Sequence, residues 1–478
     1  MPLNDITIRA NNAPSTRQPT LFASLQASRQ RRHKRRSAEN SREDQTTKRV
    51  CVKSIDTDAA PSSKQPQITK SLLTPMSIRS ALRRRQHMSV PPCNISTIHM
   101  LEGMASSAER AYHTPEAGGG RQLPLACRYS PNGDRLALVD EAGCVSMFDT
   151  SIAGPISPQN RWQAHAHAVF DAAWSYDGSM LVTAAADDTC RLWDAESGAL
   201  KGEFRGHSKT VRAVDWRHMD GSCFASGARD GSVLFWDTRC NKARGDDTYS
   251  YRPVSTIAQA HAQGRRQGRR ASMAAVSVTG LRHLRHDAHL VATVGAAAAT
   301  VRLWDVRMAQ SARSSAFAKP ISESIAPQGR ARGVASLALD PDGTRLYAPC
   351  NDGHVYVHNA AHLGEPVCQL GAPEFECRGF GSGAASSSCG RYLASGSATG
   401  AVVVWELDRV GANSSGRRAV LQGHIRDAGC VAWNPQRLQL ASCADDGLLR
   451  LWDCDSAEAE RGRSDVANRC RWGFATIH

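Results

Sequence analysis

The stretch from Gly206 to Lys242 most limits what this chain can fold into, because it holds three short apolar segments separated by turns. The segments VRAVDW, CFASGA and SVLFW have the length of β-strands, and the intervening turns HMDG and RDG are rich in Gly and Asp. A Gly-His pair opens the stretch and a Trp-Asp pair closes it, with 29 residues from His207 to Trp236. This pattern is typical of one propeller blade. A single blade cannot bury both of its faces, so the pattern should recur.

The pattern does recur along the chain. The positions equivalent to Trp236 are Phe148, Trp193, Trp236, Trp304, His358, Trp405 and Trp452. The gaps between them are 45, 43, 68, 54, 47 and 47 residues, close to the roughly 40–45 residues expected of such repeats apart from one long insertion. The sequence therefore predicts an all-β fold, a seven-bladed WD40 β-propeller with a disordered basic N-terminal tail.

The predicted domain boundaries follow from the repeats and from composition. Residues 1–93 are rich in polar and basic residues and poor in aromatic ones, so we expect them to be disordered. The propeller is predicted at 94–478, with repeats at about 122–150, 160–195, 203–238, 256–306, 330–359, 374–407 and 420–454. A terminal strand should close the ring and remove an exposed sheet edge. Residues 95–101 are our candidate for this strand, and 466–477 are the competitor; the sequence does not decide between them.

Three repeats share a set of His, Ser or Thr, Asp and Trp at fixed spacing. The members are His165, Thr183, Asp187 and Trp193; His207, Ser226, Asp230 and Trp236; and His424, Ser442, Asp446 and Trp452. The set imitates a hydrolytic triad, but an enzyme needs one active centre and this set occurs three times. We therefore interpret it as a structural hydrogen-bond network within the blades, and we predict no catalytic residue.

Charge is divided unevenly along the chain. Residues 1–100 hold 18 Lys and Arg against 6 Asp and Glu, so they carry most of the chain's net charge of +14. The propeller is therefore expected to be nearly neutral, and nucleic acid could be contacted only through the tail. The chain has no run of 18 apolar residues, no paired Cys spacing and no nucleotide or hydrolase motif. We expect no membrane span, no metal and no cofactor.

Two basic clusters are candidate functional segments. The densest one contains Arg31, Arg32, Lys34, Arg35 and Arg36, and it is typical of a nuclear localisation signal. The other lies in the long insertion and contains Arg265, Arg266, Arg269 and Arg270. This second cluster could bind a substrate or another acidic partner, or it could simply keep a loop solvated. The sequence leaves these two interpretations open.

The second to fourth repeats resemble the denticleless protein family. The resemblance rests on AHAVFDAAW, LVTAAADDTCRLWDAESGAL and SGARDGSVLFWDTRCNK, followed by a basic insertion and VRLWDVR. It implies a non-enzymatic substrate-recognition subunit of a cullin-4 RING ubiquitin ligase. Such a subunit would present chromatin- and sliding-clamp-associated replication and cell-cycle proteins for ubiquitination and degradation in the nucleus.

The resemblance also implies a docking site. Receptors of this group bind the ligase's damaged-DNA-binding β-propeller adaptor, and through it cullin-4, by Trp-Asp-x-Arg turns. The matching residues here are Trp236, Asp237 and Arg239 in one repeat and Trp304, Asp305 and Arg307 in the next. Independently of the family, an Arg just past the end of a strand can offer a planar guanidinium to a partner. The alternative is a generic nuclear WD-repeat scaffold for a chromatin- or RNA-associated complex.

The tail cluster gives a first prediction. Replacing Arg31, Arg32, Lys34, Arg35 and Arg36 with Ala in a fluorescent fusion should shift the protein toward the cytoplasm, because the signal requires clustered positive charge. Fluorescence microscopy measures the nuclear fraction. Undiminished nuclear accumulation would show that this cluster is idle or redundant with Arg83–Arg85.

Overall fold

The computed structural model describes residues 101–117, 120–152, 154–240, 242–244, 249–262, 275–308, 319–326, 332–378, 382–407, 417–464 and 473–478. All described residues belong to the second of the chain's two units, Met76–His478. The predicted tail 1–93, with its basic cluster, lies outside the described residues. Among the described helices, none is long and apolar enough to cross a membrane.

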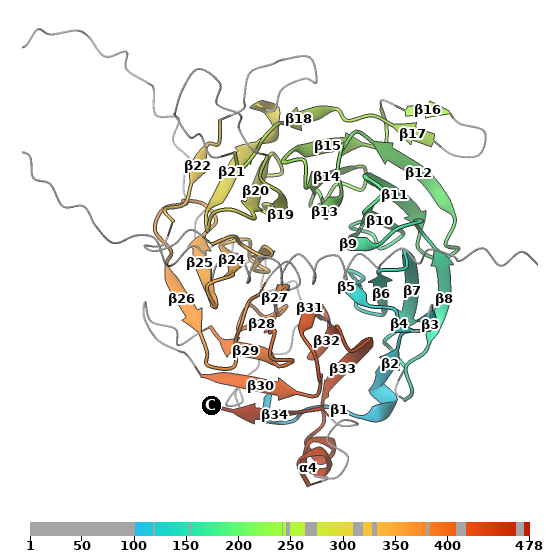
Figure 1. Cartoon of the computed structure of the whole chain (residues 1–478), viewed down its shortest axis with the longest axis vertical. Coiled ribbons are helices and arrows are strands. Elements are labelled where there is room, and N and C mark those ends of the chain that lie inside the picture. The colour runs from blue at the N-terminus through green and yellow to red at the C-terminus, as the bar shows by residue number, and fades with distance from the viewer. Residues whose placement is uncertain are drawn as a thin grey trace, which may run out of the picture. The chain divides into compact units, whose positions relative to one another are not determined.

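The described strands of the second unit form seven four-stranded antiparallel blades arranged in a ring (Figure 1). Blade 1 contains β5 (Pro124–Tyr129), β6 (Arg135–Asp140), β7 (Cys144–Asp149) and β8 (Pro158–Gln163). Blade 2 contains β9 (Val169–Trp174), β10 (Met180–Ala185), β11 (Thr189–Asp194) and β12 (Leu200–Arg205). Blade 3 contains β13 (Val211–Trp216), β14 (Cys223–Ala228), β15 (Val233–Asp237) and β18 (Ser255–Ile257). Blades 4 and 5 contain β19 (Val278–His283), β20 (Leu290–Gly295), β21 (Val301–Asp305) and β22 (Ser322–Glu323); and β23 (Ala338–Leu339), β24 (Arg345–Cys350), β25 (His354–Asn359) and β26 (Cys368–Gly371). Blades 6 and 7 contain β27 (Ala384–Ser386), β28 (Tyr392–Gly396), β29 (Val402–Glu406) and β30 (Arg418–Gln422); and β31 (Ala428–Trp433), β32 (Gln439–Ala444), β33 (Leu448–Cys454) and β1 (Met104–Ser106). The prediction of a WD40 β-propeller is confirmed.

A few short elements decorate the ring. They are the 3-10 helices η1 (Ala108–Arg110) and η2 (Val306–Met308), the strand β2 (Ala111–His113) beside β33, and the pair β3 (Glu116–Ala117) and β4 (Gly120–Arg121). The strands β16 (Lys242–Arg244) and β17 (Tyr249–Tyr251) extend blade 2 at its outer edge, and α4 (Ser456–Ser464) follows blade 7. Each sequence repeat spans the inner three strands of one blade, so the outer strand of that blade belongs to the next stretch of chain.

Both ends of the described unit close the ring. The strand β1 pairs with β33 through Met104 and Ala105, and β34 (Gly473–Ile477) pairs with β1 on one side and with β30 on the other. The outer strand of blade 7 is therefore Met104–Ser106, while most of the predicted strand 95–101 lies outside the described residues and Leu101 is not in a strand. Met104–Ser106 suits this place because all three residues are buried, as a strand between two others requires.

The three predicted networks are joined by hydrogen bonds inside blades 2, 3 and 7. In blade 7 His424 contacts Asp446 through Nδ1 (3.1 Å) and Ser442 through Nε2 (2.7 Å), and Trp452 Nε1 donates to the same Ser442 Oγ at 2.8 Å. His165 and His207 make the corresponding contacts with Asp187 and Thr183, and with Asp230 and Ser226. The indoles of Trp193 and Trp236 donate to the same two hydroxyls. The hydroxyl-bearing residues are fully buried, so they hold the blade together and cannot reach a substrate.

Blade 4 contains a shorter version that the sequence analysis did not identify. His261 Nε2 contacts Thr293 Oγ1 at 2.9 Å, and Trp304 Nε1 donates to that hydroxyl at 2.8 Å. The aspartate of the other three networks is absent here, and the run of four alanines at 296–299 lies in its place. Burial and the neighbouring Arg302 lower the pKa of His261 to about 3, so the imidazole is neutral at pH 7.

The network in blade 7 gives a second prediction. Ser442→Ala should lower the free energy of unfolding by about 1–3 kcal/mol, because it leaves the buried His424 and Trp452 nitrogens without their partner. The matched control is Ser395→Ala in blade 6. Ser395 is equally buried but donates to Gly383 O, and Trp405 Nε1 of the same blade has no partner among the described residues. Circular dichroism melts should show the larger fall in Tm for Ser442→Ala. Equal falls for the two variants would contradict this role of the network.

Candidate docking face and axial cavity

The first predicted docking turn follows β15 in blade 3. The carboxylate of Asp237 accepts hydrogen bonds from the backbone N–H of Arg239 (2.9 Å), from its Nε (2.9 Å) and from its Nη2 (2.8 Å). These bonds from Arg239 lower the pKa of Asp237 to about 2. The Arg239 side chain is nevertheless 64% exposed. Its guanidinium is therefore held in one orientation by its own turn and faces solvent.

The second predicted turn repeats this geometry in blade 4. Asp305 accepts from the backbone N–H of Arg307 at 2.9 Å and from Nη2 at 2.6 Å, and the Arg307 side chain is 62% exposed. The hydrogen bond from Arg307 lowers the pKa of Asp305 as well. An aspartate two residues before the arginine suffices for this clamp, because it caps the turn and pairs with the side chain at once.

The two turns lie at the same end of neighbouring blades. In blade 3, Asp237 pairs with Cys223 next to the β13–β14 turn, and in blade 4, Asp305 pairs with Leu290 next to the β19–β20 turn. Arg217 connects the β13–β14 turn of blade 3 to the β19–β20 turn of blade 4. It donates from Nε to Ala288 O and from Nη2 to His289 Nδ1, each at 2.9 Å. The structure therefore brings Arg239 and Arg307 onto one face of the ring.

Exposed apolar side chains occupy the turns at the same end of blades 2 to 4. Tyr176 is 52% exposed, Met219 is 65% exposed and Met308 is 73% exposed. Tyr176 makes an edge contact with His218 at 5.8 Å between ring centroids, which links the turns of blades 2 and 3. We call Tyr176, Met219, Arg239, Arg307 and Met308 the docking face. Tyr, Met and Arg are enriched at protein interfaces.

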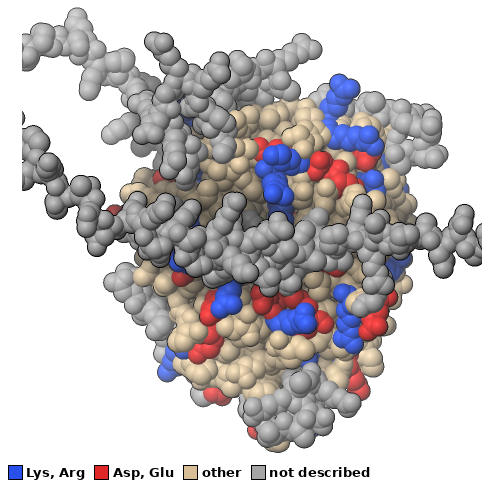
Figure 2. All heavy atoms as spheres, viewed as in Figure 1, with Lys and Arg blue, Asp and Glu red and all other residues tan. Residues whose placement is uncertain are grey.

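Sequence reasoning missed the three apolar members of the docking face. The available signal was an apolar residue inside an otherwise polar turn, as in SYDGS and RHMDG. The arginines 265, 266, 269 and 270 of the insertion lie outside the described residues. Figure 2 shows Lys and Arg interspersed with Asp and Glu on one face of the ring, so the visible described surface has no broad region of one sign.

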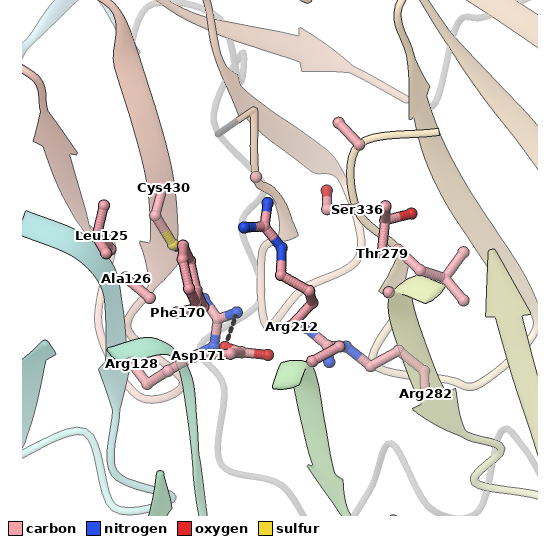
Figure 3. Close-up of a pocket in the computed structure, with 15 residues that line it drawn as sticks. Leu125, Ala126, Arg128, Phe170, Asp171, Arg212, Thr279, Arg282, Ser336 and Cys430 are labelled. Atoms are coloured by element: carbon pink, nitrogen blue, oxygen red, sulfur yellow. Dashed lines mark hydrogen bonds and ion pairs between the residues drawn. The ribbon is translucent and has the colours of Figure 1, made fainter. Parts of the chain in front are cut away.

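A small cavity of about 60 Å³ lies among the innermost strands of the ring (Figure 3). Its charged lining residues are Arg128 from β5, Asp171 from β9, Arg212 from β13 and Arg282 from β19. The lining thus contains three guanidinium groups from three blades and one carboxylate, of which Arg128 and Asp171 form an ion pair. Among the described residues, no group of three or more His, Cys, Asp or Glu side chains is placed to hold a metal ion.

Comparisons with known proteins agree with the propeller fold. The family profile described as "WD domain, G-beta repeat" matches residues 156–194, 198–237 and 416–453. The β-propeller domain of Cps50 (Swd1) from Myceliophteria thermophila superimposes with a TM-score of 0.53, covering 72% of this chain and 99% of that one at 16% identity. At that identity, the likeness shows the fold alone.

Curated relatives cover a larger part of the chain. Denticleless protein homolog A of Xenopus laevis is 31% identical over 73% of this chain and 51% of its own length. The human denticleless protein homolog is 30% identical over 73% of this chain and 49% of its own. Cell division cycle protein cdt2 of Schizosaccharomyces pombe is 27% identical over 74% of each chain. The chain spans about half the length of the vertebrate relatives that it matches.

Proposed function

Because the chain belongs to the denticleless protein family, we propose that it is the substrate-recognition subunit of a cullin-4 RING ubiquitin ligase. In this proposal the docking face binds the ligase's β-propeller adaptor, another part of the molecule binds substrates, and the partner subunits supply catalysis. The substrates would be replication and cell-cycle proteins on chromatin or on the sliding clamp, met in the nucleus. The name of the fission-yeast relative, a cell division cycle protein, supports the cell-cycle setting.

The observation that carries the proposal is the pair of clamped, exposed arginines on neighbouring blades. Asp237 and Asp305 hold the Nε–Nη2 edge of each guanidinium, so a partner carboxylate or carbonyl can approach the Nη1 edge. Holding the side chain in advance reduces the conformational entropy that binding would otherwise cost.

The apolar members of the docking face make the arginines more effective. Charged pairs at an interface contribute most where surrounding contacts exclude water. Tyr176, Met219 and Met308 are large, exposed and in turns at the same end of the blades. Methionine adapts its shape to a partner, and tyrosine adds area at low entropic cost. Together with Arg239 and Arg307 they form a mixed surface of the kind that proteins bury on association.

The proposal gives a third prediction. The double variant Arg239→Glu, Arg307→Glu should abolish capture of the purified adaptor in a pull-down. Truncating one interface hot spot typically costs about 2 kcal/mol or more, roughly a thirtyfold loss of affinity. Charge reversal adds repulsion if the adaptor site is acidic. The circular dichroism melt should stay near that of the wild type, because both side chains are exposed.

Arg205→Glu is the matched control for this experiment. Arg205 is 68% exposed and pairs with Glu203, a carboxylate two residues earlier, at 2.7 Å, but it lies on the outer strand β12. This variant should capture the adaptor as the wild type does. If the double variant also captures the adaptor normally, docking occurs elsewhere. If the wild-type chain purifies from cells without adaptor and cullin, it is a scaffold of another assembly.

A further inference from the structure

Three buried thiols meet where the last blade packs against the first. Cys127 comes from β5 of blade 1, and Cys430 and Cys443 come from β31 and β32 of blade 7, two strands that pack against β5. We call this contact of β5 with β31 and β32 the seam. The thiols of Cys430 and Cys443 both hydrogen-bond with the Cys127 thiol, and Cys430 Sγ also lies 3.7 Å from Cys127 O. Sulfur atoms of both blades are therefore in contact at the seam.

Arg128 places a positive charge against one of these thiols. Its Nη1 donates to Cys430 Sγ and to Cys127 O, each at 3.0 Å, while its Nη2 donates to Asp171 Oδ1 at 2.7 Å. Hydrogen bonds with the Cys127 and Cys443 thiols, together with the charge of Arg128, lower the pKa of Cys430 well below its usual range. The hydrogen bond with Cys430 and burial raise the pKa of Cys127. Cys430 therefore loses its proton first, and the thiolate is the nucleophilic form of cysteine.

A small molecule can reach Cys430 more easily than the other two thiols. Cys430 lines the axial cavity (Figure 3) and is 5% exposed, whereas Cys127 and Cys443 are 0% exposed. The Arg128 side chain beside it is 26% exposed, so solvent reaches this part of the cavity. A volume of about 60 Å³ is enough for a molecule slightly larger than water, such as hydrogen peroxide.

The two exposed cysteines of the described residues, Cys240 and Cys454, are in the opposite situation. Partial burial and the charge of Asp237 raise the pKa of Cys240. Partial burial and the charge of Asp455 raise the pKa of Cys454. Both thiols therefore stay protonated at pH 7, where a thiol reacts slowly with a peroxide. Cys430 combines thiolate character with access to a small molecule.

We propose that Cys430 is a site of reversible oxidation by hydrogen peroxide, and that Cys127 then forms a disulfide with it across the seam. In the first step the Cys430 thiolate attacks one peroxide oxygen, the O–O bond breaks, and hydroxide leaves and takes up a proton to become water. Cys430 is then a sulfenic acid. In the second step the Cys127 sulfur attacks the Cys430 sulfur, the S–O bond breaks, and water leaves with the Cys127 proton. The two thiols lose two electrons and two protons, and the peroxide is reduced to two water molecules.

The disulfide would fasten the first blade to the last. It would join residues that lie 303 positions apart in the chain. A cross-link restricts the unfolded chain more when it closes a longer loop, so the oxidised ring should be more resistant to unfolding. The inference concerns the seam alone and does not depend on the proposed function.

Peptide mapping of the full chain tests this inference. The reduced protein is treated with hydrogen peroxide, the remaining thiols are alkylated, and the digest is analysed by mass spectrometry without reduction. A Cys127–Cys430 disulfide should appear, and Cys430 should be consumed at least about tenfold faster than Cys240. The oxidised protein should have a Tm about 3 °C or more above that of the reduced protein. A Cys430–Cys443 disulfide, no disulfide at Cys430, or equal consumption of Cys430 and Cys240 would overturn the proposal.

Cys127→Ala and Cys443→Ala form a matched pair, because both thiols are fully buried in the same core cluster. Cys127→Ala should lose the disulfide and leave a sulfenic acid at Cys430 that dimedone labels. Cys443→Ala should keep the disulfide and the rise in Tm on oxidation. A disulfide at Cys430 in the first variant, or its loss in a folded second variant, would contradict the role of Cys127. The map of the wild-type protein decides the pairing even where a variant does not fold.

Arg128 is a positioning residue in this proposal, because it acts through the Cys430 thiolate. Arg128→Gln should raise the pH at which oxidation of Cys430 reaches half its maximal rate, whereas Arg128→Lys keeps the positive charge and should raise it less. The other charged side chains that line the cavity, Asp171, Arg212 and Arg282, are retained in both variants. An unchanged pH profile in Arg128→Gln would refute this role of Arg128, since a merely structural residue would not shift it.

Discussion

Ring closure is the constraint on which the other features of this protein depend. Blade 7 has three strands of its own, and its fourth is β1, whose partner residues in β33 lie about 350 positions later in the chain. The strand β34 then pairs with both β1 and β30, so it joins blades 6 and 7 into one continuous sheet. An open ring would leave strand edges unpaired. It would also separate the turns that make the docking face and the inner strands that line the cavity.

Within the closed ring, the blades are not equally reinforced. Blades 2, 3 and 7 have a complete His, hydroxyl, Asp and Trp network; blade 4 has no aspartate, and the buried indole of Trp405 in blade 6 meets no acceptor among the described residues. Fully satisfied buried polar groups favour one arrangement of the chain, whereas unsatisfied ones cost free energy. Blade 7, which receives the closing strand, therefore combines long-range pairing with a complete local network.

The arginines of the described ring lie in two different environments. Arg239 and Arg307 are exposed and are oriented by an aspartate of their own turn, which suits contact with a large protein surface. Arg212 is in the interior, where its guanidinium carbon lies 4.2 Å from the centroid of the Phe170 ring and burial lowers its pKa to about 10. The register of blade 3 places these environments at opposite ends.

The sequence by itself determined the repeat, the blade strands, the three networks and the two Trp-Asp-x-Arg turns. These features arise from contacts within one blade, where spacing alone fixes which residues meet: Ser226 lies ten residues before Trp236, and Asp237 two before Arg239. Only the tertiary structure decided that Met104–Ser106 lies between β33 and β34, that Tyr176, Met219 and Met308 occupy the same end as the two arginines, and that Arg128, Arg212 and Arg282 converge. These relations join blades or chain ends. They follow from the closure of the ring, which no local pattern of residues encodes.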